Sequence, residues 1–270
     1  ARPSFKEASF ASIFDPLSTR TFIGGFVQDR LQNEILWDGN LTSTRINNYD
    51  LRWEYFQEGG QMVSLSAFYK TFDDPIEIVQ FLQAPNNFQP RNVGDGELWG
   101  AELEVRQSLN IIAPALKVIS LNANVTVIES QIDMSQSEYE SRLQTAREGQ
   151  TVDRQRSMAG QAPYIVNGGL QYTGQENGLQ AGFFYNVRGE TLFAVGVLDR
   201  PDVYSVPFHS LNFNANYAFG ANDRMNLGLK ASNILNDVRE KKYDAYQAED
   251  RIFTRFRPLR LYGLSFGYRF

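Results

Sequence analysis

The residues best suited to acid–base chemistry are charged side chains that recur at every second position. Glu102, Glu104 and Arg106 follow this spacing, and Arg52 and Glu54 repeat it earlier in the chain. On an extended strand this spacing places the side chains on one face. Two carboxylates on one face could share general acid and general base roles. A hydrated face held by charged hydrogen bonds uses the same residues, and the pattern favours this second role.

A single histidine, His209, restricts the remaining catalytic arrangements. A histidine base must lie beside a polar nucleophile, yet His209 shares its strand parity with Leu211 and Phe213. We therefore expect it on the apolar face or at its rim. The chain has no cysteine, which excludes disulfides, thiolate nucleophiles and cysteine zinc sites. It has no phosphate-binding glycine loop and no nucleophile elbow, so we expect no enzyme activity, no cofactor and no metal site.

The segments that carry these residues alternate apolar and polar side chains with a period of two. Most are about 9 to 12 residues long, the length that a tilted strand needs to cross a bilayer. The ten segments are 1–9, 49–57, 61–71, 97–107, 117–128, 163–173, 179–189, 208–219, 225–232 and 259–270. No apolar run reaches the ~18 residues of a transmembrane helix. The pattern predicts an all-β fold of about ten strands.

The connections between these segments alternate strictly between short and long. The short ones are 58–60, 108–116, 174–178 and 220–223, and the long ones are 10–47, 72–96, 129–162, 190–206 and 234–257. Outer-membrane barrels have short periplasmic turns and long outer loops, whereas a soluble sandwich has no reason to gather its long loops at one end. Tyrosine and tryptophan cluster near strand ends, as in the aromatic girdles of such barrels. The sequence therefore predicts a transmembrane antiparallel β-barrel.

Composition excludes one class of partner. The net charge is −5, and a nucleic-acid partner would need a basic surface. We expect outer-membrane lipid on the apolar face of the strands and no nucleic acid.

The final segment carries a further signal. Its apolar face alternates aromatic and aliphatic residues up to the terminal phenylalanine: Tyr262, Leu264, Phe266, Tyr268 and Phe270. This arrangement resembles the signal that the barrel-assembly machinery reads in outer-membrane proteins. It would place Phe270 on the periplasmic side and all the long loops on the outside.

Several motifs, taken in order, resemble those of TonB-dependent receptors. Residues 1–7 (ARPSFKE) resemble the strand that opens this part of the barrel, and 39–41 with 48–56 resemble its "GNP-L…N-Y-D-x-R-x-E" segment. Further matches are Phe68-Tyr69-Lys70 with Asp74-Pro75-Ile76-Glu77, Gly100-Ala101-Glu102-Leu103-Glu104, 160–167 and 231–237. Leu41 departs from the proline of the family pattern, and 18–38 looks like an insertion. The resemblance spans essentially the whole chain.

The resemblance implies active import of a scarce ligand across the outer membrane of a Gram-negative bacterium. The complete receptor would be a 22-stranded barrel with an N-terminal plug, energised through TonB. Residues 1–270 would be a single barrel segment without that plug. About ten strands cannot form a 22-stranded barrel, because an open sheet would leave two unpaired edges in lipid. We therefore expect a fragment or one half of a split receptor, with a self-closing barrel as the other option. The chain opens at Ala1-Arg2-Pro3 as though cut from something longer, and it carries no signal peptide.

The resemblance also assigns provisional roles. Arg52, Glu54, Glu102, Glu104 and Arg106 would face the plug. Ligand contacts would come from the outer loops: Tyr243, Tyr246 and Phe253 in 234–257, and Arg154 and Arg156 in the charged stretch 139–156, which could include a short helix.

The expected partners are the plug, TonB acting through it, the barrel-assembly machinery and a surface lipoprotein. Siderophore, cobalamin, glycan and peptide ligands remain open. The alternatives to active import are a passive channel, a barrel enzyme and a scaffold for another envelope protein.

Overall fold

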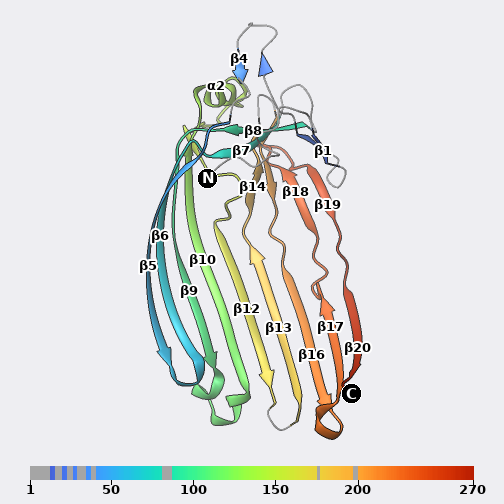
Figure 1. The fold of residues 1–270 in the computed structure, drawn as a ribbon. Helices are drawn as coiled ribbons and strands as arrows, with labels where there is room; N and C mark the ends of the chain where they lie inside the picture. The colour runs from blue at the N-terminus through green and yellow to red at the C-terminus, as the bar shows by residue number, and fades with distance from the viewer. Residues whose placement is uncertain are drawn as a thin grey trace.

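The chain forms one tall, curved wall of strands with a smaller folded layer across one end (Figure 1). The computed structural model describes residues 13–15, 20–22, 27–28, 35–37, 41–80, 87–174, 177–196 and 200–270. No helix in these ranges is long and apolar enough to cross a membrane.

Nine long strands make up the wall, and each pairs antiparallel with the next along the chain. They are β5 (Arg45–Gln57), β6 (Gln61–Asp73), β9 (Gly96–Ser108), β10 (Ile119–Asp133), β12 (Tyr164–Thr173), β13 (Leu179–Arg188), β16 (Ser210–Phe219), β17 (Met225–Ser232) and β20 (Leu261–Tyr268). Nine of the ten predicted segments are therefore strands, and the segment 1–9 lies outside the described residues. Among the described strands, β5 and β20 each pair on one side only, so the wall has two free edges.

The register keeps polar and apolar residues on separate faces of the wall. Glu104 lies opposite Ser64 on β6 and Asn124 on β10, while the adjacent Leu103 lies opposite Leu65 and Val125. A slip of one residue would exchange the two faces, so the alternation in the sequence fixes the pairing. The polar face is concave and borders an open hollow of about 600 Å³.

The apolar face is exposed along the whole height of the wall. Its most exposed side chains include Leu51, Trp53, Leu65, Val127, Phe183, Leu229 and Leu264. Leu264, for example, is 76% exposed. An apolar surface of this extent is stable only against an apolar medium, which agrees with a wall that stands in lipid.

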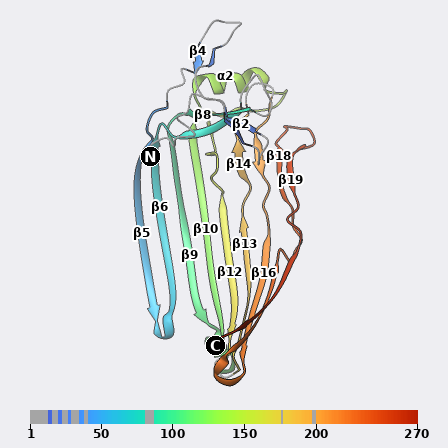
Figure 2. The ribbon, with the colours of Figure 1, turned by 45° about the vertical axis from the view of Figure 1, so that its right-hand side comes forward.

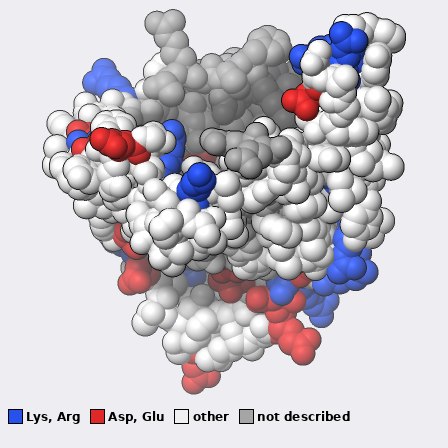
Figure 3. All heavy atoms as spheres, turned by 90° about the horizontal axis from the view of Figure 1, so that it is seen from below, with Lys and Arg blue, Asp and Glu red and all other residues white. Residues whose placement is uncertain are grey.

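Short turns join the strands at the end opposite the folded layer. One of them, η1 (Glu58–Gly60), places Gly59 and Gly60 at φ angles of 75° and 77°, a left-handed conformation that glycine adopts without strain. The C-terminus lies at this end in both ribbon views (Figures 1 and 2). Seen from this end, basic and acidic side chains are spread around the molecule rather than gathered into one patch (Figure 3).

The long connections at the other end are not open loops but a folded layer, which we call the cap. The cap contains β1 (Ile13–Asp15), β2 (Arg20–Phe22), β3 (Val27–Gln28), β4 (Ile35–Trp37), β7 (Ile76–Gln80), β8 (Asn87–Asn92), α2 (Gln136–Thr145), β11 (Gln155–Arg156), β14 (Thr191–Ala194), β15 (Val203–Ser205), β18 (Arg239–Tyr243) and β19 (Ile252–Phe256). The helix predicted within 139–156 is α2. It begins earlier, because the Ser135 hydroxyl accepts a hydrogen bond from the Glu138 amide at 3.2 Å and caps its first turn.

The hydrophobic core lies between the cap and the outer ends of the wall strands. Leu98 and Ile132 of the wall pack with Val79, Leu192 and Val195 of the cap. A second cluster joins Phe88, Ala194 and Val203 within the cap. The wall has no apolar inner layer of its own, so the apolar residues of the loops fold back onto its rim.

Candidate functional site

Four of the five predicted lumenal charges form one network on the polar face. Arg52 donates from Nε to Glu54 Oε1 at 2.6 Å and from Nη2 to Glu104 Oε2 at 3.0 Å. Arg106 approaches Glu104 Oε1 to 2.8 Å. The fifth residue, Glu102, accepts a hydrogen bond from the Asn124 amide. The five charges lie on β5 and β9, with β6 between these two strands. We call this part of the wall the charged sector.

The neighbouring part of the polar face, across β10, β12, β13 and β16, is rich in side-chain amides, with Arg188 at the end of β13. Asn124, Asn167 and Asn186 lie opposite one another on three adjacent strands. Asn186 donates to Asn167, and Asn167 donates to Asn124 at 3.5 Å. Together with Asn122 and Asn212 they line the open hollow of about 600 Å³. We call this part of the wall the amide sector.

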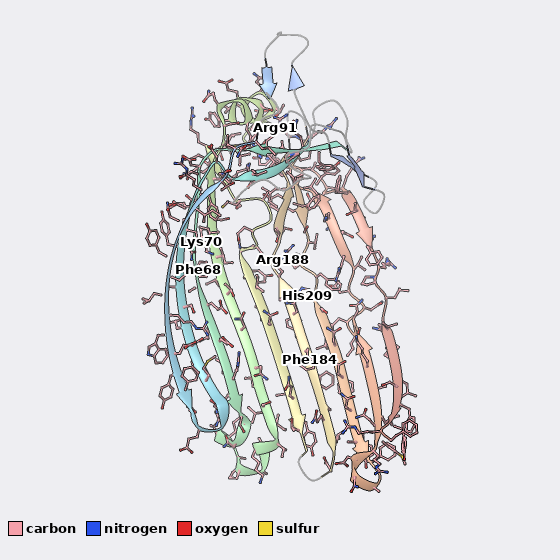
Figure 4. The ribbon with its side chains drawn as sticks, viewed as in Figure 1. Phe68, Lys70, Arg91, Phe184, Arg188 and His209 are labelled. Atoms are coloured by element: carbon pink, nitrogen blue, oxygen red, sulfur yellow. The ribbon has the colours of Figure 1, made fainter. Side chains whose placement is uncertain are left out.

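An aromatic ring lies in the middle of the amide sector. Phe184 of β13 faces Gly169 on β12 and Asn212 on β16, and Figure 4 labels it low on the wall. A Cβ atom at Gly169 would come within 3.3 Å of the ring, and one at Gly182 within 3.0 Å. The ring therefore lies over two glycines, close to the backbone of the sheet.

The cap contains a chain of ion pairs of alternating sign. Arg156 contacts Glu77 at 2.8 Å and Glu138 at 2.7 Å. Arg142 contacts Glu138 at 3.2 Å and Asp202 at 2.9 Å. The Glu77 carboxylate also accepts from the Ala159 amide at 2.7 Å. The chain ties β7, α2, β11 and the segment before β15 into one unit.

Burial makes this ion-pair chain electrostatically strong. The Arg156 side chain is 7% exposed and that of Glu77 is 4% exposed. Burial by itself would lower the pKa of Arg156, but the carboxylates of Glu77 and Glu138 outweigh it, so the pKa lies above its ordinary value. Burial also lowers the pKa of Arg91 in the cap to about 10.

The residues predicted for ligand contact are spread over the cap. Tyr243 and Phe253 pack edge to face, with ring centres 5.2 Å apart. The Tyr246 hydroxyl donates to the Gly149 carbonyl at 2.9 Å, and the Arg154 guanidinium stacks 4.4 Å from the Tyr139 ring centre. Arg156 is held in its ion pairs. Tyr246 and Arg156 line one cavity of about 400 Å³, and ligand contact by these residues stays a prediction.

Two further predictions concern the apolar face. His209 lies beside Tyr185, whose hydroxyl is 2.6 Å from His209 Nδ1, and its backbone amide donates to Asp237 at 2.7 Å. In the predicted assembly signal, Tyr262, Leu264, Phe266 and Tyr268 alternate on β20, Phe270 follows the end of the strand, and all five residues are exposed. Among the described residues, no group of three or more His, Asp or Glu side chains converges as it would to hold a metal ion.

Two parts of the site were not predicted. Glu77 belongs to a recognised motif, but nothing in the sequence indicates its partner Arg156. Phe184 is an aromatic residue at a polar strand position, between Gly182 and Asn186. That break in the alternation is a signal that could have identified it.

The comparison with protein families identifies the fold. The family described as "TonB dependent receptor-like, beta-barrel" matches residues 3–234. The chain belongs to this family. It is therefore a β-barrel receptor chain of the Gram-negative outer membrane, and the predicted fold class, family and location are confirmed. The short turns face the periplasm and the cap faces the exterior.

Solved structures of the family share this fold at low sequence identity. The FrpB iron transporter from Neisseria meningitidis (F3-3 variant) is 17% identical with a TM-score of 0.54, and the match covers 87% of this chain and 31% of that one. The ferric citrate transporter FecA in its unliganded form is 16% identical with a TM-score of 0.57, covering 82% and 31%. The ferric yersiniabactin uptake receptor FyuA from Yersinia pestis is 16% identical with a TM-score of 0.56, covering 85% and 30%.

The extent of these matches limits what they show. The chain spans about a third of the length of the structures it matches. No curated protein matches the chain.

Proposed function

We propose that this chain forms part of the barrel wall and the outer cap of a receptor that imports a scarce ligand actively, with energy delivered through TonB. The observation that carries the proposal is a membrane wall whose concave face is polar and whose outer end bears a folded cap. A wall of this kind can surround a hydrated path, and a cap above it can capture a ligand. Family membership supports the same function.

The charged sector is the part of the wall best suited to hold a plug. Arg52, Glu104 and Arg106 are already oriented by one another, and their exposed donors and acceptors can bind a polar surface without a large ordering cost. We assign plug contact to this sector. We assign no catalytic step to the chain, because the ring of its one histidine, His209, hydrogen-bonds with Tyr185 on the apolar face.

The test is uptake by the whole receptor in cells with and without functional TonB. Active import predicts that accumulation of a bound ligand stops when TonB is removed, while ligand binding at the cell surface remains. A passive channel predicts flux that does not depend on TonB, and that result would overturn the proposal.

The contact with the plug has its own test. In a receptor carrying Arg52→Cys, a single cysteine placed on the plug should form a disulfide with the wall under oxidation. Trp53→Cys is the matched control, because Trp53 is the adjacent residue and lies on the lipid face. Equal cross-linking from both positions would contradict the assignment.

A further inference from the structure

The connection between β19 and β20 joins the cap to the last strand of the wall and is rich in arginine. Arg255 lies in β19, and Arg257 and Arg260 follow it before β20 begins at Leu261. All three arginines are exposed, and we call them the arginine cluster. β19 lies beside the cap, and β20 stands in the wall below it (Figure 1). The cluster therefore lies at the level where the lipid face ends and the outer solution begins.

The apolar face of β20 leads directly up to the arginine cluster. Tyr262, Leu264 and Phe266 alternate along the lipid face and are 67%, 76% and 64% exposed. Arg260 lies two residues before Tyr262, so in an extended chain it follows the same face. Its Nε atom donates to the Ile234 carbonyl at 2.9 Å, which holds the guanidinium at the end of β17. The lipid face of β20 thus presents an apolar strip with a cation at its outer end.

The positive charge of this region is only partly compensated. Glu240 accepts from Arg255 and contacts Lys242 at 3.5 Å. In the part of the chain that the structure describes, neither Arg257 nor Arg260 forms an ion pair. The other acids of the connection 234–257 are Asp237, whose carboxylate accepts two backbone amides, and three residues in the tip between β18 and β19, which are Asp244, Glu249 and Asp250.

The outer ends of β6, β9 and β10 carry the opposite charge. Asp73, Glu97 and Asp133 lie there and line one hollow of about 320 Å³, and Arg45 is the cation that pairs in register with Asp73. Basic segments beside a membrane attract anionic lipid headgroups, and acidic segments repel them. An anionic headgroup is therefore directed away from this side of the wall and toward the arginine cluster.

We propose that the arginine cluster binds the phosphate groups of an outer-leaflet glycolipid, whose acyl chains lie along Tyr262, Leu264 and Phe266. The outer leaflet of a Gram-negative outer membrane consists of such phosphorylated glycolipids. A guanidinium group binds a phosphate through two parallel hydrogen bonds. The apolar strip below the cluster favours a lipid over a free phosphate ion, because the ion has no part that could cover it.

The position of the cluster on the lipid face keeps it open in a complete barrel. Lipid-facing side chains point away from the barrel axis, so a strand that continued the wall beyond β20 would stand beside this face rather than over it. The inference concerns the membrane around the receptor and does not depend on the proposed import function.

The experiment titrates the whole receptor in detergent with lipid A bisphosphate and measures binding by native mass spectrometry. We expect the lipid to bind, and the double variant Arg257→Gln with Arg260→Gln to weaken binding about tenfold or more. Arg224→Gln with Arg269→Gln is the matched control. It removes the same charge at the periplasmic end, where the Arg269 amide donates to the Arg224 carbonyl at 2.8 Å, and it should leave binding unchanged.

Two further probes identify the source of the phosphate. Dephosphorylated lipid A keeps the acyl chains, and we expect it to bind about tenfold more weakly or worse than the bisphosphate. Inorganic phosphate at the same concentration should not displace the lipid. Equal binding of the two lipids would overturn the proposal, as would displacement by inorganic phosphate or an equal loss in the two double variants.

A charge-retaining variant guards against loss of folding. Arg257→Lys with Arg260→Lys keeps both positive charges, and lysine binds phosphate as a point charge. We expect this variant to bind the bisphosphate within about threefold of the unmodified receptor. Equal losses in the lysine and glutamine variants would show that charge is not the cause and would overturn the proposal.

Discussion

The wall and the cap both use arginine–carboxylate pairs, but they place them in opposite surroundings. In the wall, Arg52 and Glu54 are 39% and 37% exposed. In the cap, Arg156 and Glu77 are almost fully buried. An exposed pair contributes ~0–1 kcal/mol because water and salt screen it. A buried pair makes each partner strongly dependent on the other, since removing one leaves an uncompensated charge. The comparison predicts a wall that tolerates changes to its charges and a cap that does not.

The largest expected effect is therefore in the cap. Arg156→Ala removes the common partner of Glu77 and Glu138 and leaves both carboxylates without a counter-charge from that residue. We expect the cap to lose ~3–5 kcal/mol of stability. Hydrogen exchange of the whole receptor in its membrane would show faster exchange of α2 and β7, with the wall strands unchanged.

Arg52→Ala is the control for this prediction. It removes the same side chain from an exposed network, and we expect a loss below ~1 kcal/mol. Equal losses from the two variants would show that burial does not distinguish the cap from the wall.

The next effect sharpens the difference between the two faces of the wall. Val125 lies on the lipid face and is 37% exposed, and Val125→Arg would place a charge in the hydrocarbon at a cost of ~2–4 kcal/mol. Thr126→Arg, one residue further, faces Glu102 across the strand pair, and we expect a change within about 0.5 kcal/mol. Urea unfolding of the receptor in lipid vesicles measures both. A similar cost for both substitutions would mean that the polar face does not border water.

A third effect tests the junction of wall and cap. A Cβ atom at Gly100 would lie 2.4 Å from the Val127 carbonyl oxygen and 2.6 Å from the Phe68 ring, and Phe68 packs on the core beneath the cap. Gly100→Ala should cost ~1–3 kcal/mol through overpacking. Gly168→Ala, where nothing lies within 4 Å, should change stability by at most about 0.5 kcal/mol. The thermal unfolding midpoints of the two variants measure this difference. Equal midpoints would show that Gly100→Ala is tolerated and would refute close packing at Gly100.

The same contrast explains what could be predicted from the sequence. The wall follows from a local rule, because each strand must alternate to face lipid and water. The segment 225–232 coincides with β17, and 49–57 lies within β5. The extension of β10 to Asp133 was not predicted. It depends on pairing with β9 up to Ile132 and with β11, and neither partner is visible in the alternation of β10 itself.

The cap could not be predicted by such a rule. Its ion pairs join residues that are distant in sequence, such as Arg142 and Asp202, which are 60 positions apart. A charged stretch such as 139–156 looks the same whether it is exposed or buried in a network. The lumenal charges were predicted together because β5, β6 and β9 are successive strands of one sheet, whereas Phe184 interrupts the local pattern and was missed.

The smallest expected effect concerns the pH dependence of the cap. Burial raises the pKa of the Asp244 carboxyl above its ordinary value of 3.8, and Asp250 and Asp202 raise it further. The folded cap therefore binds this proton more tightly than the unfolded chain. This contribution is fully present below the ordinary pKa and is lost as the pH rises through the raised one. Asp244→Asn should make the cap more stable at pH 7 by less than ~1 kcal/mol, because solvent screens an exposed carboxylate.

The difference should disappear at pH values below 3.8, where Asp244 is protonated in both states. Hydrogen exchange of the backbone amide of residue 244, which donates to the Asp202 carbonyl at 2.9 Å, measures the change in cap stability directly. Asp223→Asn in the periplasmic turn is the control and should leave the exchange rate of this amide unchanged. Slower exchange of the variant at pH 7 would show that the charge of Asp244 destabilises the folded cap. Faster exchange would mean that the Asp244 carboxylate contributes a favourable contact.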